Sequence, residues 1–148
     1  MENQDVTLYL DSVAHEKLKK DQKLFHIGRA ESILIKRIIV NYYPKYNQEM
    51  KELNNKIKNS IASQIDPDLI SEEAYANIAW NITKYLGERT IKKSVSTDKK
   101  DKLHFRINKR ENDLDQILML CPTDATKSEF IANIIYSYLD KPQYERER

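Results

Sequence analysis

An internal repeat restricts the folds open to this chain more than any other feature of its sequence. When residues 14–45 are aligned with residues 110–141, at an offset of 96, eight of the 32 positions are identical, whereas chance would give about two. The identical pairs are Leu18/Leu114, Leu24/Leu120, Ser32/Ser128, Ile35/Ile131, Ile38/Ile134, Ile39/Ile135, Tyr42/Tyr138 and Lys45/Lys141. Four of them have the i, i+3, i+4, i+7 spacing of one helix face. The repeat therefore predicts two copies of one unit, each burying the same apolar helix stripe.

A short segment of alternating apolar and polar residues precedes each copy. VTLYL, at residues 6–10, and LHFRIN, at residues 103–108, each put apolar side chains on one face and mostly polar side chains on the other. Strict alternation with β-branched and aromatic residues is typical of a half-buried β-strand. The two segments align at an offset of 97, so the repeat extends over both strands with a single one-residue gap.

Capping residues and helix breakers predict where the helices of each copy begin and end. The first helix of the first copy is expected to begin near residues 11–12, where Asp and Ser are good N-caps, and to end before Gly28. Its counterpart is expected over about residues 109–120. The second helices are expected to start near Ala30 and Thr126, and of these two residues only Thr126 carries a capping hydroxyl.

A lone strand with two helices is not a stable unit, because its backbone ladder is unpaired and its apolar face is uncovered. Two copies solve this problem together when their strands pair as an antiparallel ribbon and four helices close over the inner face. We therefore predict a mainly α-helical fold with a two-stranded antiparallel β-ribbon, with tandem units at residues 1–44 and 101–148 and a helical insertion with a basic linker at residues 45–100. The strands could pair within one chain, as a pseudo-dimer, or between chains of a homo-oligomer.

This strand-helix-helix unit resembles the ribbon-helix-helix superfamily of Met, Arc and CopG-type repressors. TKSEFI, at residues 126–131, is similar to the start of the family's second helix. The first copy, GRAESILI, keeps the family's turn glycine but has Ala30 where a capping hydroxyl is usual. The second copy keeps the hydroxyl and has Asp124 in place of that glycine. The resemblance covers residues 5–44 and 102–140, about half of the chain.

The resemblance implies a transcriptional repressor or regulator that binds double-stranded DNA with its ribbon in the major groove. The outward side chains that would contact bases are Thr7, Tyr9, His104, Arg106 and Asn108. The starts of the second helices would hold backbone phosphates. The residues implied there are Arg29, Ser32, Thr126, Lys127 and Ser128. Each of these residues also has a plain alternative role, as a strand former, a solvated charge or a helix cap.

Charge is unevenly distributed along the chain. The net charge is only +2, but residues 89–110 hold nine lysines and arginines against two acids. The first strand is the poorer candidate reader of DNA, because Asp5 is acidic and Tyr9 is bulky. Two alternatives to a repressor therefore stay open. One is a plasmid partition or relaxosome accessory DNA-binding protein, and the other is a protein-interaction or inhibitor module without DNA readout.

The middle of the chain, residues 45–100, has no partner in the repeat. Pro44 is expected to end the first unit, because a proline in a helix interior removes a hydrogen bond and clashes with the preceding turn. A polar helix is then expected over about residues 48–64, broken by the Asp-Pro-Asp sequence at residues 66–68.

A further helix is expected to start with Ser71 as its N-cap and to stop at Gly87. The basic segment at residues 93–102 then predicts a flexible linker into the second strand. These middle helices would pack on the core and support oligomer formation, or bind a protein partner with Trp80 as the anchor.

Signals for an enzyme are weak. The chain has only two glycines, which excludes phosphate-binding glycine loops, and it has no nucleophile elbow or zinc-protease motif. Its three histidines form no metal-spaced pair with each other or with the single cysteine. We therefore expect no enzymatic activity, no cofactor and no metal. The N-terminus lacks a signal-peptide pattern and no apolar run approaches a membrane span. Both features favour a cytoplasmic protein, associated with the nucleoid through DNA, without a membrane partner.

Overall fold

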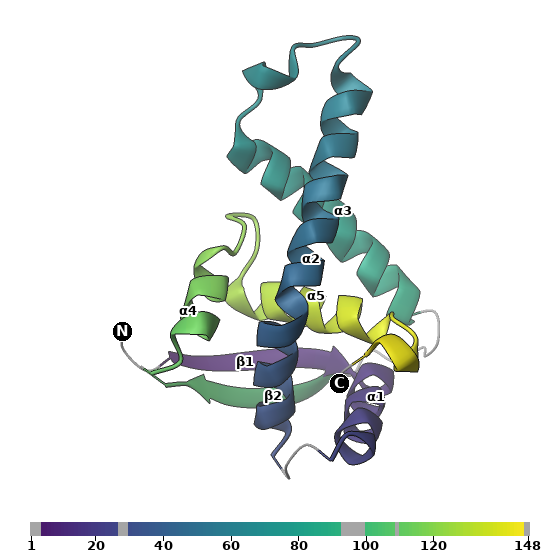
Figure 1. Cartoon of the computed structure of the whole chain (residues 1–148), viewed down its shortest axis with the longest axis vertical. Helices are drawn as coiled ribbons and strands as arrows, with labels where there is room; N and C mark the ends of the chain where they lie inside the picture. The colour runs from purple at the N-terminus through teal and green to yellow at the C-terminus, as the bar shows by residue number, and fades with distance from the viewer. Residues whose placement is uncertain (1–3, 27–29, 93–99, 109, 147–148) are drawn as a thin grey trace.

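The computed structural model describes residues 4–26, 30–92, 100–108 and 110–146, and the side chains among them except those of residues 84–100 and 143. The elements in chain order are β1 (Gln4–Asp11), α1 (Ser12–Leu24), α2 (Glu31–Ile61), a 3-10 turn (Pro67–Leu69), α3 (Glu72–Lys92), β2 (Lys100–Ile107), α4 (Asn112–Met119), α5 (Lys127–Leu139) and a second 3-10 turn (Gln143–Glu145). The prediction of a mainly helical chain with one two-stranded antiparallel sheet is confirmed (Figure 1).

The two strands pair with each other inside one chain. β1 and β2 run antiparallel, from the pair Gln4–Ile107 to the pair Asp11–Lys100. β1 is longer at both ends than its alternating segment in the sequence. β2 starts earlier than its segment, within the last residues of the expected linker, and ends one residue earlier, at Ile107. The alternation is confirmed, since all six apolar side chains of the two segments are buried on one face. They are Val6, Leu8, Leu10, Leu103, Phe105 and Ile107.

The register of the ribbon has the symmetry of the repeat. When two equivalent antiparallel strands are related by a twofold axis, the axis passes between the strands, midway between a residue and its own counterpart, which pair with each other. Thr7 pairs with His104, and the offset of 97 that aligns the two strands also relates Thr7 to His104. The ribbon therefore has a pseudo-twofold axis at its centre.

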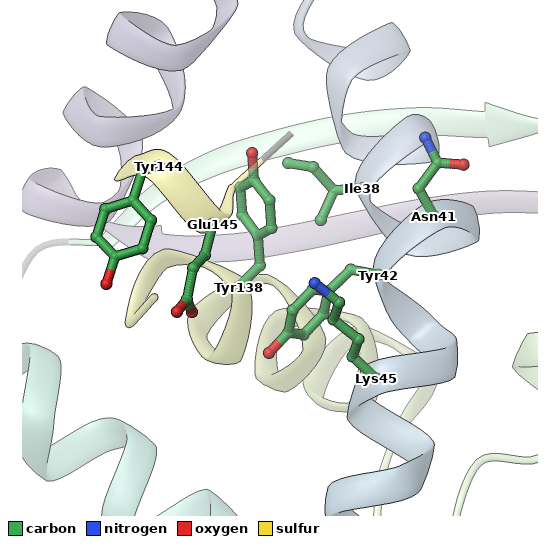
Figure 2. Close-up of a pocket in the computed structure, with 7 residues that line it drawn as sticks. All are labelled: Ile38, Asn41, Tyr42, Lys45, Tyr138, Tyr144 and Glu145. Atoms are coloured by element: carbon green, nitrogen blue, oxygen red, sulfur yellow. The ribbon is translucent and has the colours of Figure 1, made fainter. Parts of the chain in front are cut away.

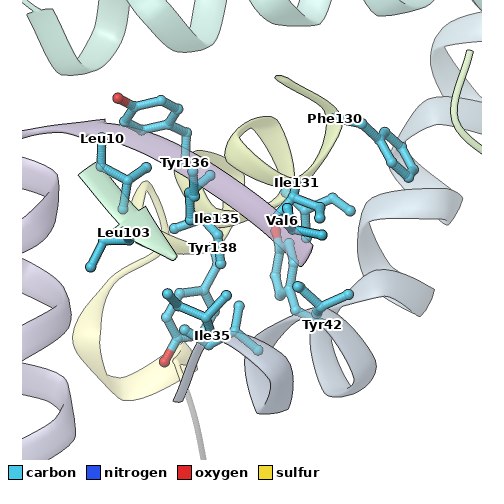
Figure 3. Close-up of a cluster of buried hydrophobic side chains, with 14 of the residues drawn as sticks. Val6, Leu10, Ile35, Tyr42, Leu103, Phe130, Ile131, Ile135, Tyr136 and Tyr138 are labelled. Atoms are coloured by element: carbon cyan, nitrogen blue, oxygen red, sulfur yellow. The ribbon is translucent and has the colours of Figure 1, made fainter. Parts of the chain in front are cut away.

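The helix stripes meet beneath the ribbon on the same axis. All eight stripe residues are buried, four on α2 and their four counterparts on α5. The rings of Tyr42 and Tyr138, which are counterparts in the repeat, pack edge to face with their centroids 5.6 Å apart (Figure 3). The shared stripe is thus the surface through which the two copies form one core.

The helix starts follow the capping residues. Asp11 caps α1 by accepting a hydrogen bond from the Ala14 amide, at 2.8 Å. Thr126 caps α5 in a complete capping box with Glu129. Ala30, at the equivalent position of α2, makes no side-chain capping hydrogen bond. The predicted difference between the two second helices is confirmed.

The prediction that Pro44 ends the first unit's helix is wrong, because α2 continues through Pro44 to Ile61 as one helix. A proline in a helix interior costs about 3 kcal/mol. Tyr42 and Tyr46, on either side of it, are buried, and burying each large apolar side chain returns about 2 kcal/mol. Tertiary packing therefore outweighs the local cost.

The predicted stop at Gly87 is also wrong, since α3 runs on to Lys92. One glycine costs a helix about 1 kcal/mol, which is too little to end it. The separate helix expected over residues 48–64 is instead the last part of α2, which ends at Ile61. The predicted start of α3 and the break before it are confirmed. Ser71 caps α3 by accepting from the Ala74 amide, at 3.1 Å, and the break before it contains the 3-10 turn at Pro67–Leu69.

The second half of α2 and the first half of α3 form a helical hairpin that projects away from the ribbon (Figure 1). Trp80 is fully buried, and its ring lies 6.3 Å from that of Phe130 on α5. The suggestion that Trp80 is the anchor for a protein partner is therefore wrong, because Trp80 is buried in the core that joins the hairpin to α5. Among the described helices, none is both long and apolar enough to cross a membrane.

Candidate nucleic-acid interface

The outer face of the ribbon presents polar side chains to solvent. It consists of Asp5, Thr7 and Tyr9 on β1 and Lys102, His104 and Arg106 on β2. The side chains of the opposite face are buried and form the core together with residues of the helices. Four of the five residues predicted to contact bases, Thr7, Tyr9, His104 and Arg106, are brought together here. Lys102 was missed because the strand was expected to start one residue later, although the period of two already places it on this face.

An ion pair crosses the ribbon at one end of this face. Arg106 donates from Nε to Asp5 Oδ1 at 2.8 Å, and His104 Nε2 lies 3.7 Å from the same oxygen. All three side chains are more than half exposed. The hydrogen bond from Arg106 holds the pKa of Asp5 below its ordinary value and raises the pKa of Arg106. Asp5, the acid that makes β1 the poorer candidate for DNA contact, is therefore the direct partner of Arg106, the strongest candidate for base contact.

The centre and the other end of the face differ from this ion pair. At the pseudo-twofold axis, Thr7 Oγ1 and His104 Nδ1 lie 3.4 Å apart. Beyond them Tyr9 pairs with Lys102, and the Tyr9 side chain is 48% exposed. The face thus carries two cations, Lys102 and Arg106, against one carboxylate. Its chemistry is polar and mildly basic.

The sequence predicted that Asn108 lies in the ribbon. This prediction is wrong, because β2 ends at Ile107. The exposed position of Asn108 is in the turn before α4, where its backbone N–H donates to Glu111 Oε1 at 3.0 Å. Lys36 of α2 donates to the same oxygen at 2.9 Å. Burial acts to raise the pKa of Glu111, but these hydrogen bonds outweigh it and lower that pKa. Asn108 therefore helps to order the turn from β2 to α4.

The three residues predicted to hold phosphate at the start of α5 lie beside β1 and are engaged within the chain. Thr126 caps the helix. Ser128 Oγ donates a short hydrogen bond to the carbonyl oxygen of Thr7. Lys127 is exposed, and its Nζ donates to Gln4 Oε1 at 2.9 Å. These contacts place the N-terminus of α5 at one edge of the ribbon.

The corresponding residues predicted in the first copy are Arg29 and Ser32. Arg29 lies outside the described residues. Ser32 is half-buried in the first turn of α2, one residue after the acid Glu31. At the described position, the first copy therefore has an acid next to its serine where the second copy has Lys127 next to Ser128.

One histidine between two carboxylates joins three elements at the other end of the ribbon, and the sequence did not reveal this group. His15 of α1 lies 2.7 Å from Asp101 of β2 and 2.9 Å from Glu31 of α2, measured from its two ring nitrogens. Burial acts to lower the pKa of His15, but the two carboxylates outweigh it and raise that pKa. No local pattern links these residues, since His15 is 16 positions from Glu31 and 86 positions from Asp101.

A cavity of about 510 Å³ lies between α2 and the C-terminal 3-10 turn (Figure 2). Tyr42, Tyr138, Tyr144, Lys45 and Glu145 are among its lining residues. Of the predicted DNA-contacting residues that the structure describes, none lines it. Burial raises the pKa of Tyr42, whose hydroxyl donates to the Ser137 carbonyl at 3.3 Å. The Tyr42 hydroxyl is therefore held in its protonated form, as a hydrogen-bond donor to that carbonyl.

Comparison of the chain with protein-family models, with curated proteins and with solved structures gives no match.

Proposed function

We propose that this chain is a sequence-specific DNA-binding protein, a repressor or similar regulator, in which two ribbon-helix-helix units are joined in one chain. The observation that carries the proposal is the antiparallel ribbon with a pseudo-twofold axis at Thr7 and His104, whose outer-face side chains are exposed or half-buried. A two-stranded ribbon of this kind fits the major groove of B-DNA. One chain would then supply the whole ribbon.

The side chains of the outer face suit contact with bases. Arg106 can fork to O6 and N7 of guanine, and Thr7 and His104 can donate or accept hydrogen bonds at the centre of the ribbon. Lys102 adds a point charge near the sugar-phosphate backbone or a guanine. These residues lie within one antiparallel pair of strands, so they would enter the groove together.

The start of α5 suits contact with a phosphate at the edge of the groove. Thr126 and Glu129 use two of the first-turn amides in the capping box. In the described part of the chain, the amides of Lys127 and Ser128 have no acceptor, and a helix N-terminus attracts anions. The Lys127 ammonium lies on the same side, next to Gln4. The second copy therefore supports phosphate binding better than the first.

Binding to mixed-sequence duplex DNA, titrated from low to high salt, tests the proposal. Neutralising several phosphates gives a steep linear fall of the logarithm of the affinity with that of the salt concentration. Arg106→Ala should weaken binding about tenfold or more, whereas Lys51→Ala, which removes an exposed cation from α2 in the projecting hairpin, should change it little. Protein that shifts no duplex at low salt would contradict the proposal.

A plasmid partition or relaxosome accessory role is a variant of this proposal in which the projecting hairpin assembles several chains on DNA. The exposed apolar surface on that hairpin favours the accessory role. It includes Leu69, which is 74% exposed, and the half-exposed Ile65. The mass of the protein on a long duplex distinguishes the variants. A single chain on each site favours a simple regulator, and ordered multiples favour the accessory role.

A protein-interaction or inhibitor module on the same scaffold is the second candidate. Two observations favour it: Arg106 is paired with an acid, and Thr126, Lys127 and Ser128 are used within the chain. This function predicts no salt-dependent DNA binding at all. The same titration therefore separates it from the first proposal.

A further inference from the structure

Asp5 and Arg106 form a defined unit on the outer face of the ribbon. The hydrogen bond uses Nε of Arg106 and one oxygen of Asp5. Within the described part of the chain, the two terminal nitrogens of Arg106 have no hydrogen-bond partner. Because the guanidinium is planar, fixing Nε sets the direction in which the paired N–H groups of these nitrogens point.

We infer that Asp5 is a positioning residue that holds Arg106 for bidentate recognition of one guanine, and that the DNA site of this protein is consequently asymmetric. The inference rests on the proposed function and adds to it the base read by Arg106. Paired N–H groups at the end of an arginine match the O6 and N7 acceptors of guanine in the major groove. A free arginine loses much rotamer freedom when it binds a base, and an arginine already held by a carboxylate loses less.

The pseudo-twofold axis shows why only one half of the site would contain this guanine. The offset of 97 relates Arg106 to Tyr9 and Asp5 to Lys102. Where one half of the face presents a paired arginine and carboxylate, the other presents a tyrosine opposite a lysine. A tyrosine hydroxyl cannot form the forked contact to guanine. The strand register has the symmetry of the repeat, but the side chains that would contact bases do not. We therefore do not expect a palindromic site.

Asp5 has a simpler alternative role, which predicts the opposite result. If Asp5 only masks Arg106 and repels phosphate, its removal frees a cation and strengthens binding to every sequence alike. If Asp5 positions Arg106, its removal lowers the preference for guanine at one position, although the protein becomes less negative. Measuring total affinity and base preference separately distinguishes these two roles.

The experiment is selection of bound duplexes from a random-sequence library with the full chain, followed by titration of the selected duplex and of its single-base variants. We expect an asymmetric site in which one guanine is preferred about ten- to a hundred-fold over other bases. Arg106→Ala should abolish that preference. Asp5→Ala should reduce it several-fold while binding to random duplex stays equal or becomes tighter. Asp5→Asn, whose amide oxygen can still accept from Nε, should keep more of the preference than Asp5→Ala.

Glu52→Ala is the matched control, since it removes one exposed carboxylate from α2 in the projecting hairpin. It should leave both affinity and base preference unchanged. A palindromic selected site, or full guanine preference in Asp5→Ala, would overturn the inference while DNA binding itself stands. If the unaltered protein selects no duplex even at low salt, the proposed function fails instead.

Discussion

The two strand-helix-helix copies use the same core and differ on their surfaces. In both, the apolar stripe of the second helix is buried and meets its counterpart at the Tyr42–Tyr138 contact. In the first copy this helix is α2, which has 31 residues and no side-chain cap. In the second it is α5, which has 13 residues and a capping box. The comparison teaches that the two copies have the same residues where they pack against each other in the core. Outside this contact, their helix lengths, caps and charges differ.

A buried charge is a second difference between the copies. Asp21 of α1 is 2% exposed, and the repeat places the apolar Ile117 of α4 at the equivalent position. Arg146, near the C-terminus, donates to both carboxylate oxygens of Asp21, at 2.7 and 2.9 Å. In the first copy this position therefore needs an ion pair with Arg146, which we call the clamp on Asp21. In the second copy an apolar side chain, Ile117, packs there without a charge.

The largest expected effect tests whether the two stripes are equal. Ile38→Ala on α2 and Ile134→Ala on α5 each remove a fully buried side chain, and each should lower the free energy of unfolding by roughly 3–4 kcal/mol. Urea unfolding followed by circular dichroism measures both. The control is Ile33→Ala on the exposed side of α2, with an expected change below about 0.5 kcal/mol. A large loss from only one of the two core variants would mean that the copies do not share one core.

The clamp on Asp21 should show the next largest effect. Arg146→Ala leaves a buried carboxylate without its cation, and the free energy of unfolding should fall by about 3 kcal/mol. Replacing the pair by the residue of the second copy, in Asp21→Ile with Arg146→Ala, should recover part of that loss, because no charge is then left buried. The same unfolding measurement applies. A double variant less stable than Arg146→Ala alone would argue that Asp21 has a further role.

The helix caps allow the difference between α2 and α5 to be changed in either direction. Thr126→Ala should destabilise the protein by about 1 kcal/mol, because it removes the side-chain acceptor for the Glu129 amide. Ala30→Ser should stabilise it by up to about 1 kcal/mol, since residue 30 already has the extended backbone of an N-cap. Thermal melts of the two variants should therefore shift in opposite directions. No gain from Ala30→Ser would indicate that another group already satisfies the start of α2.

The smallest effect concerns His15, whose pKa is raised in the folded protein. Such a group binds its proton more tightly when folded, so its stabilisation is full below its ordinary pKa of 6.5 and is lost as pH rises through the folded pKa. The unaltered protein should exceed His15→Gln in stability by about 1 kcal/mol at mildly acidic pH, with a smaller difference at alkaline pH. Urea unfolding of both proteins at several pH values gives that difference. A difference that grows with pH would contradict the contacts to Asp101 and Glu31.

Periodicity predicted the parts of the fold that depend on near neighbours in the sequence. The alternation around residues 6–10 and 103–108 identified both strands and their buried faces, and the repeated stripe identified the buried sides of α2 and α5. It also placed Thr7, Tyr9, His104 and Arg106 on one outward surface. The continuation of α2 through Pro44 was not predictable in this way, because the packing that offsets the proline comes from other elements.

By itself, the sequence determined that one strand and helix pattern occurs twice and which side chains that pattern buries, because burial follows the repeat period of the backbone. Only the tertiary structure decided that the two strands pair within one chain, with Thr7 opposite His104. That register in turn places Asp5 against Arg106, and the packing of α1, α2 and β2 brings His15 between two carboxylates. Such contacts join residues about a hundred positions apart in the ribbon, and local periodicity contains no information on which distant side chain will be the neighbour.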